Sequence, residues 1–361
     1  MKAERPTSAT TATARAFVLA NREAARDLGR SLAALVDDPR EFALALDVGL
    51  RRLADPIYAE GMRRVAPGIG PIHGVRTPLL DDVFSSLARR LRGIAPAQVL
   101  VLADRLEREP VLEPRWLAFR LLDRTIAVDA ERTWQVMRRA AGRTGDWITV
   151  DRLAEPYARG VLLERHRWSE LEQLTYARSM WERRLVGSTI ARMPFEPRDG
   201  GRGPEVARRG LEVVGSLIGD AEPDVQKALA WALRSLALVD RPAVGAFCRR
   251  EATRAAGSDD GHRAWVLRDA AAKLDRTDAD AVNATLAGIR RHADRPSTSE
   301  AAAAAALFTD LTASDDLPDL PAPVSAARVG AASSGAARDR DPGRRHRRHH
   351  STIVTDRRSA P

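Results

Sequence analysis

Residues 222–236, which read EPDVQKALAWALRSL, show most clearly how this chain folds. Proline suits the first turn of a helix, where its missing N–H group is not needed. Leu229, Leu233 and Leu236 then recur at spacings of three and four residues, which places them on one face of a helix. The stretch therefore predicts an amphipathic helix that buries one side against neighbouring helices.

Two other segments open in a similar way, with a basic residue in the first turns ahead of an apolar face. They are residues 113–118, EPRWLA, and residues 180–185, MWERRL. The segments at 180 and 222 lie about 40 residues apart, which is the period of HEAT-type helix pairs. This spacing favours an α-solenoid of antiparallel helix pairs, and a plain helical bundle is the alternative. In a solenoid the second helices line a concave face, which would gather the basic residues on one shared surface.

The same kind of pattern continues through most of the chain, broken by Pro, Gly or Asp. Ala, Leu and Arg recur while β-branched runs are rare, which favours helix over strand. We expect one all-α, armadillo-like helical domain over residues 15–295. Helices are expected at 77–91, 96–106, 114–126, 131–141, 181–193, 204–218, 223–238 and 262–274.

The two ends differ in composition from this domain. Residues 1–14 are rich in Thr, Ala and Ser, and we expect a flexible leader there. Residues 296–361 pass from an alanine run through Asp, Pro and Ser to an Arg/His cluster at 344–350. We expect this segment to be a disordered tail, because a run of charged residues is typical of a solvated chain.

Composition indicates an anionic partner. The chain has 58 Lys and Arg against 49 Asp and Glu, a formal net charge of +9, with part of the excess in the Arg/His cluster. Basic side chains near a polyphosphate release its condensed counterions, but charge alone does not separate DNA, RNA and a membrane surface. The single cysteine, Cys248, excludes an internal disulfide framework and any CxxC motif, and we expect it to pack in the core.

No segment approaches the length of apolar sequence that a membrane span needs, and the first residues lack the apolar stretch of a signal peptide. We therefore expect a soluble cytoplasmic protein without a membrane partner. Histidines 73, 166, 262 and 292 are scattered without metal-ligand spacing, so no metal site is expected.

Three groups of residues are candidates for chemistry. Trp147 and Asp151 are four residues apart, so on a helix they share one face, and Asp146 is placed to cap that helix. A half-buried tryptophan with a surface aspartate explains the same spacing by packing alone. Trp181 is followed three residues later by Arg184, which either faces out or pairs with an acid.

The third group is a stripe of cation, indole and cation on the helix quoted first. Lys227, Trp231 and Arg234 fall at spacings of four and three residues. Cations that meet phosphates and an aromatic face that meets a base or sugar suit a nucleic-acid surface. A core tryptophan flanked by long basic side chains is the alternative.

Taken together, these residues resemble the DNA alkylation repair enzymes of the AlkD type, which are HEAT-like-repeat DNA glycosylases. The resemblance runs in order through residues 74–78 (GVRTP), Trp147-x-x-x-Asp151, Trp181-x-x-Arg184 and Gln226-Lys227-Ala228-x-x-Trp231-x-x-Arg234. It implies a repair enzyme for double-stranded DNA that needs no cofactor and works in the bacterial cytosol, associated with the nucleoid. The reaction would be hydrolysis of the N-glycosidic bond of N3- and N7-alkylated purines such as 3-methyladenine and 7-methylguanine.

The resemblance also implies roles for single residues. Asp151 would be the catalytic carboxylate, and Trp147 and Trp231 would wall the deoxyribose of the lesion. Arg184 would lie on the phosphates in the same cleft. The other residues expected to contact DNA are Lys227, Arg234, Arg76 and Thr77.

The chemistry fits this implication. Alkylation at N3 or N7 makes the base cationic, so it leaves readily while the sugar develops oxocarbenium character. A carboxylate stabilises that charge and orients water, and indole faces attract cations. Enzymes acting on bases normally extrude them, whereas AlkD-like enzymes work from the sugar side.

The alternatives are a non-catalytic HEAT-repeat module that binds distorted or branched DNA and a protein-binding scaffold. Retention of all four site residues favours the enzyme, which we expect to be a monomer.

Overall fold

The computed structural model describes residues 9–313, and this part of the chain is helical. Within it lie sixteen α-helices, four short 3₁₀ helices and one isolated β-bridge. The first eight α-helices are α1 (Ala9–Leu32), α2 (Pro39–Arg52), α3 (Pro56–Val65), α4 (Thr77–Arg90), α5 (Pro96–Glu107), α6 (Leu112–Thr125), α7 (Ala130–Ala141) and α8 (Trp147–Leu163). The others are α9 (Arg167–Gln173), α10 (Met180–Arg192), α11 (Pro204–Leu217), α12 (Pro223–Leu236), α13 (Arg241–Ser258), α14 (Gly261–Ala271), α15 (Arg276–Thr285) and α16 (Glu300–Ala313).

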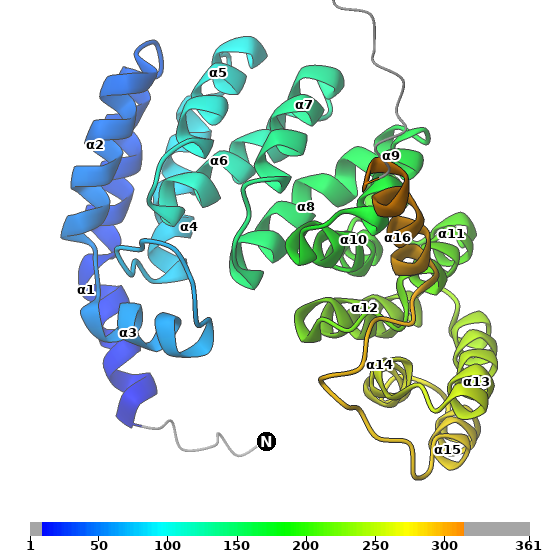
Figure 1. The fold of residues 1–361 in the computed structure, drawn as a ribbon. Coiled ribbons are helices and arrows are strands. Elements are labelled where there is room, and N and C mark those ends of the chain that lie inside the picture. Colours follow the sequence, from blue (N-terminus) through cyan, green and yellow to red (C-terminus); the bar gives the residue numbers. More distant parts are fainter. Residues whose placement is uncertain (1–8, 314–361) are drawn as a thin grey trace, which may run out of the picture. The chain divides into compact units, whose positions relative to one another are not determined.

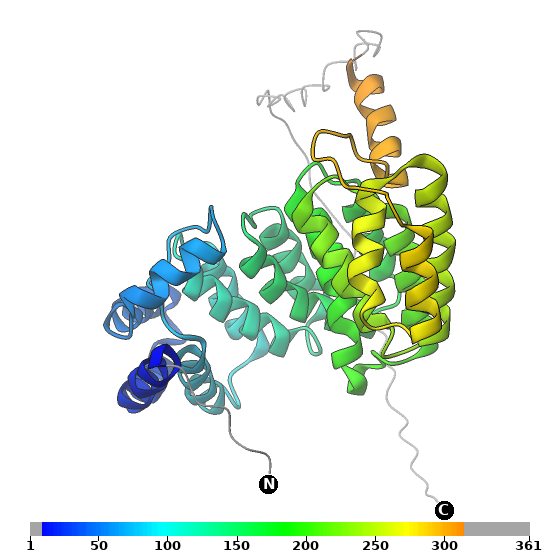
Figure 2. The same ribbon diagram turned by 90° about the horizontal axis from the view of Figure 1, so that it is seen from below.

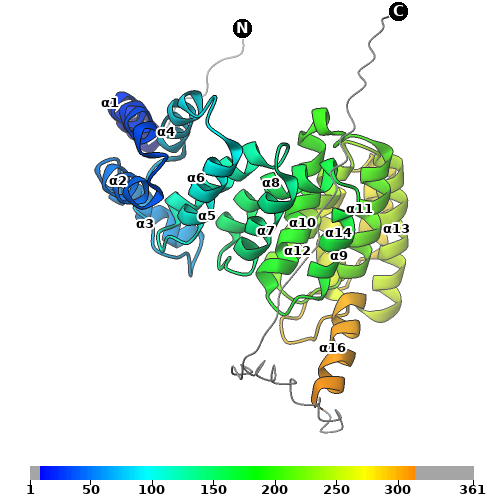
Figure 3. The ribbon, with the colours of Figure 1, turned by 90° about the horizontal axis from the view of Figure 1, so that it is seen from above.

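The helices pack in adjacent pairs that form two layers. Helices α4, α6, α8, α10, α12 and α14 follow one another in one layer, which we call the even-numbered layer (Figure 1). Helix α1 extends this layer by packing on α4, and α2 packs on α5 on the other side. Figure 3 separates the two layers, with α1, α4, α6 and α8 along one side and α2, α5 and α7 along the other. This architecture confirms the HEAT-like solenoid expected from the sequence.

The eight helices expected from apolar spacing are all present, and their ends lie within three residues of the expected ones. Proline occupies the first turn of α4, α5, α11 and α12, where its fixed φ suits the start of a helix. Helix starts were therefore well marked in the sequence.

The structure corrects the expectation at both ends of the domain. Helix α1 begins at Ala9, inside the expected flexible leader of residues 1–14, and α16 lies inside the expected disordered tail of residues 296–361. Both helices are rich in alanine, which has the highest helix propensity, so composition was a poor guide to disorder there. The rest of both expectations, including the Arg/His cluster, falls on residues 1–8 and 314–361, outside the described residues.

Residues 290–299, which we call the strap, run back across α14 and α12 before α16 begins (Figures 1 and 2). The amide of Thr298 donates to the carbonyl oxygen of Gly219 at 2.9 Å. Nη1 of Arg291 donates to Oε1 of Gln226 on α12 at 3.0 Å. The strap is therefore part of the folded domain.

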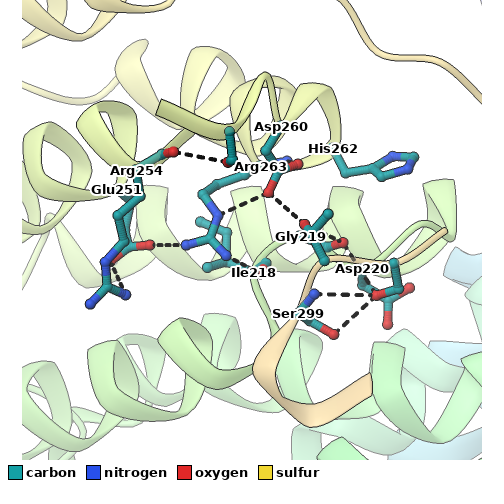
Figure 4. Close-up of polar contacts among 12 residues, drawn as sticks. Ile218, Gly219, Asp220, Glu251, Arg254, Asp260, His262, Arg263 and Ser299 are labelled. Atoms are coloured by element: carbon teal, nitrogen blue, oxygen red, sulfur yellow. Dashed lines mark hydrogen bonds and ion pairs between the residues drawn. The ribbon is translucent and has the colours of Figure 1, made fainter. Parts of the chain in front are cut away.

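A buried arginine lies beneath the strap (Figure 4). Arg263 is 7% exposed, and its guanidinium donates to the carboxylates of Asp260 and Glu251 and to the carbonyl oxygen of Ile218. Asp260 also accepts a hydrogen bond from the hydroxyl of Thr298. Buried charges are tolerated when they are paired and hydrogen-bonded, and these pairs tie α13, α14 and the strap together.

The interior holds Cys248, as expected from the sequence, together with several tryptophans. Trp116, Trp134, Trp168 and Cys248 are buried, and Trp265 is half-buried against the same core. Burial raises the pKa of the Cys248 thiol to about 12, so this cysteine stays protonated at neutral pH. Among the described helices, none combines the length and the apolar character that crossing a membrane requires.

Candidate active site

Helix α8 starts at Trp147 and carries Asp151 one turn later. Oδ1 of Asp146 accepts the amide of Thr149 at 2.8 Å, so Asp146 caps this helix as expected from the sequence. Trp147 is half-buried against the core, and the side chain of Asp151 is 22% exposed. The cap defines where the helix begins, and the spacing of four residues then puts the indole and the carboxylate on one face.

Two side chains of α10 hold the carboxylate of Asp151. Nε of Arg184 donates to Oδ1 at 3.2 Å, and Nη2 donates to Oδ2 at 2.8 Å. The hydroxyl of Ser188 donates to Oδ1 at 2.7 Å. A bidentate guanidinium restricts the orientation of a carboxylate as well as balancing its charge. Asp151 is therefore an oriented anion that remains partly open to solvent.

Arg184 forms part of the wall of the site. Its side chain is only 6% exposed, and Nη1 donates to the carbonyl oxygen of Asp224 on α12 at 2.6 Å. The guanidinium carbon lies 5.8 Å from the centroid of the Trp147 ring. Each guanidinium nitrogen thus already has a partner on α8 or α12. The expected phosphate contact at Arg184 stays a prediction, and this geometry favours a role in positioning Asp151.

The neighbouring arginine is also paired. Nε of Arg183 donates to Asp220 at 2.7 Å, and Nη1 donates to the carbonyl oxygen of Ala177 at 2.9 Å. Neither arginine of this segment therefore projects freely into solvent, because acids and carbonyl groups of neighbouring segments hold both.

Helix α12 carries the cation, indole and cation stripe. Lys227 is exposed, and its Nζ lies 3.2 Å from Oδ1 of Asp224 at the start of the helix. Trp231 is half-buried, and Arg234 pairs with Asp269 of α14. Within residues 9–313 no hydrogen bond or ring contact joins Trp231 to the Trp147 and Asp151 pair. Trp231 lies on α12, the helix that follows α10 in the even-numbered layer.

Arg76 directly precedes α4 and Thr77 begins it, after a loop whose backbone amides bind a buried carboxylate. Glu113 is 1% exposed and accepts the amides of His73, Gly74 and Val75 at 3.1, 2.7 and 3.2 Å. Gly74 has a φ of +86°, and a Cβ atom there would lie 2.5 Å from that of Ala59, so glycine is required. This loop sets the position at which α4 starts.

Arg76 itself is held by an acid and an aromatic ring. Its Nε donates to Oδ2 of Asp55 at 2.7 Å, and its guanidinium carbon lies 5.0 Å from the centroid of the Tyr58 ring. Burial alone would raise the pKa of Asp55, but the Arg76 guanidinium and the amides of Ile57 and Tyr58 outweigh it, so the pKa is lowered. Arg76 therefore keeps Asp55 ionised and helps to fix α3 against α4.

A groove of about 490 Å³ opens between α4, α6 and α8. Thr77, Phe84, Trp116, Arg120 and Arg152 are among its lining residues. Arg152 follows Asp151 directly, so the groove and the held carboxylate use adjacent residues of α8.

Two of the histidines are satisfied by local partners. Nε2 of His73 lies 2.7 Å from Oδ1 of Asp47, and Nδ1 of His262 lies 3.1 Å from the side-chain nitrogen Nε2 of Gln226. In the described part of the chain, no group of three or more His, Cys, Asp or Glu side chains is arranged to hold a metal ion.

The chain matches the family model described as DNA alkylation repair enzyme over residues 46–274. It belongs to this family. The matched range reaches from α2 to the end of α14, so it includes the held carboxylate, the α12 stripe and the start of α4. No relative is found among curated proteins.

Sequence reasoning missed two residues, Ser188 beside Asp151 and Arg152 in the neighbouring groove. Ser188 lies four residues after Arg184, a spacing that places both on one face of α10 and could have indicated their shared contact with Asp151. Arg152 gave no such signal, because its partners Trp116 and Thr77 come from distant parts of the chain.

Proposed function

We propose that this protein hydrolyses the N-glycosidic bond of cationic N3- and N7-alkylated purines in duplex DNA. The observation that carries the proposal is the carboxylate of Asp151, which three donors hold beside the partly exposed indole of Trp147. Membership of the DNA alkylation repair enzyme family supports the same conclusion.

The arrangement suits a reaction in which positive charge builds on the sugar. A base alkylated at N3 or N7 leaves as a neutral molecule, so its departure needs no proton from the enzyme. The remaining demand is an anion that opposes the oxocarbenium charge and orients the attacking water, which is the role we assign to Asp151. The indoles of Trp147 and Trp231 would each contribute about 0.5–2 kcal/mol of cation–π attraction.

Arg184 and Ser188 are positioning residues in this scheme. A preorganised anion costs no reorientation as the charge develops, and the donors from α10 supply that order. The cationic Arg184 lies behind the carboxylate, within the wall of α8, α10 and α12, while part of Asp151 stays open.

The test is release of 7-methylguanine from methylated duplex DNA by the full chain and by Asp151→Asn. Asparagine keeps the size of the side chain but removes its charge, so release should fall by at least about 100-fold while binding to the duplex is retained. Glu155→Gln is a matched control, because Glu155 is an exposed carboxylate one turn later on α8, paired with Arg192 at 2.6 Å. It should keep the wild-type rate.

A second candidate function is non-catalytic binding of distorted or branched DNA. The observation that favours it is that both carboxylate oxygens of Asp151 are already engaged by Arg184. This candidate predicts no release by the wild type together with tight binding to the same duplex, and that result would overturn the enzyme proposal.

A further inference from the structure

Arg152 occupies a different side of α8 from Asp151. Consecutive residues of a helix are rotated by about 100°, so Asp151 faces α10 while Arg152 turns towards α6 and α4. The Arg152 guanidinium carbon lies 4.4 Å from the centroid of the Trp116 ring, and Nη2 lies 3.4 Å from the hydroxyl oxygen of Thr77. The two residues thus place a held anion and a cation on adjacent sides of one helix.

The charge of Arg152 lacks a carboxylate partner, in contrast to those of its neighbours. Arg120 in the same groove pairs with Asp81, and Arg159, two turns along α8, pairs with Asp123 and Asp199. For Arg152 no ion pair is found across residues 9–313, and its polar contact is the neutral hydroxyl of Thr77. Burial lowers the pKa of Arg152, and the acids of the groove, Asp81 and Glu155, lie too far away to form an ion pair and offset this effect only in part.

The groove around Arg152 continues past the start of α4. A second groove of about 470 Å³ is lined by Arg15, Tyr58, Arg76 and Thr77. Thr77 lines both grooves, so the two meet at this residue. It is the first residue of α4, and the positive end of a helix dipole favours an anion. The two grooves therefore run from α1 over the start of α4 to Arg152 on α8, and three acids, Asp81, Asp123 and Glu155, line the groove beside Arg152.

The chemistry of the groove favours a phosphate over a base. Trp116 is 4% exposed and Arg152 covers its ring, so the indole is not available for stacking. The edge of a guanidinium carries N–H donors in a fork that matches two oxygens of a phosphate. Thr77 adds a hydroxyl at the same place.

We infer that Arg152 binds a backbone phosphate of the DNA strand at the start of α4 and thereby sets where the strand crosses α8 next to Asp151. The inference rests on the proposed function for its substrate, duplex DNA. It makes Arg152 a binding and positioning residue, because the phosphate contact fixes the sugar relative to the carboxylate.

The test uses Arg152→Met in the full chain, since methionine keeps an unbranched stem over Trp116 and removes the charge. The readout is the affinity for a short undamaged duplex, measured across a series of salt concentrations. Loss of one phosphate contact should weaken binding about tenfold at low salt and reduce the salt slope by about 0.9. Arg152→Lys should restore most of the slope.

Arg120 supplies the matched control. Arg120 lies in the same groove and over the ring of Phe84, with a guanidinium carbon to centroid distance of 4.2 Å, but Asp81 already balances its charge. Replaced together with its partner, as Arg120→Met with Asp81→Asn, it removes no net charge from the groove and should leave the salt slope unchanged. An unchanged slope in Arg152→Met, or an equal loss in the Arg120→Met and Asp81→Asn double variant, would overturn the inference, even where Arg152→Met lowers the melting temperature.

Binding to undamaged DNA needs no catalysis, so the two proposals fail separately. If Arg152→Met leaves the salt slope unchanged while the wild type releases 7-methylguanine, only the role of Arg152 is overturned. If Arg152→Met reduces the salt slope but the wild type releases no 7-methylguanine, the phosphate site stands and the glycosylase proposal is overturned.

Discussion

Asp151 and Arg184 form a bidentate ion pair between α8 and α10, with Nη2 to Oδ2 at 2.8 Å and Nε to Oδ1 at 3.2 Å. The remaining nitrogen of Arg184 reaches the carbonyl oxygen of Asp224 on α12. One arginine therefore connects three consecutive helices of the even-numbered layer around one carboxylate. Changes at Arg184 should act on the site through the orientation of Asp151.

Arg184→Ala should lower the single-turnover rate of 7-methylguanine release by about 100-fold, because misplacing a reacting group by about 1 Å has an effect of that size. The salt dependence of duplex binding should stay unchanged, since the guanidinium is buried in the wall of the site. Arg192→Ala is the control, because Arg192 joins the same two helices through the exposed Glu155. A preserved rate with a reduced salt slope would instead assign Arg184 to a phosphate.

Glu113→Gln should destabilise the protein by about 1–3 kcal/mol, because an amide replaces one acceptor oxygen of a buried carboxylate with a donor that faces backbone N–H groups. Urea unfolding followed by circular dichroism measures the change. Glu60→Gln removes an exposed carboxylate paired with Arg64 within α3 and should change stability by less than about 0.5 kcal/mol. Equal effects of the two substitutions would contradict the role given to Glu113.

Asp55 should make stability depend on pH in acid. Its folded pKa is lowered from the usual value of 3.8, so its stabilisation is fully present above that value and is lost as pH falls through the folded pKa. The difference in unfolding free energy between wild type and Asp55→Asn should be largest near neutral pH and should narrow below about pH 4. A difference that stays constant from neutral pH into this range would argue against the Arg76 pairing as its source.

Gly187→Ala should separate α10 from α12. A Cβ atom at Gly187 would lie 2.8 Å from the carbonyl carbon of Ala228, so the helices must move apart, at a cost of about 1–3 kcal/mol. The same substitution at Gly61 in α3 meets no atom within 4 Å and should be neutral or stabilising, because alanine favours helix. Thermal melts of the two variants test this contrast, and a neutral Gly187→Ala would contradict the close approach.

The sequence predicted much of the fold, because helix starts are local. Proline and aspartate mark where helices begin, and apolar spacing marks the buried face of each. It did not predict that α8 continues through Pro156, since packing between neighbouring helices can outweigh one lost backbone hydrogen bond. The helical parts of both ends were missed because alanine-rich segments were judged by composition.

The candidate site was predictable only where it depends on one helix. The shared face of Trp147 and Asp151 follows from their spacing, and so does the Asp146 cap. The partners of Arg184 could not be predicted, because its contacts with Asp151 and Asp224 depend on how α8, α10 and α12 are aligned. Spacing within one helix carries no information on that alignment.

The folded domain extends beyond the family match at both ends. The family match ends at residue 274, yet Arg291 and Thr298 hydrogen-bond to Gln226 and Gly219 from beyond that limit. At the other end, α1 precedes the match and packs on α4. A fragment trimmed to residues 46–274 would expose apolar and polar surfaces that are covered in the whole domain. The packed domain is thus longer than the part that the family model matches, and expression clones should keep residues 9–313 together.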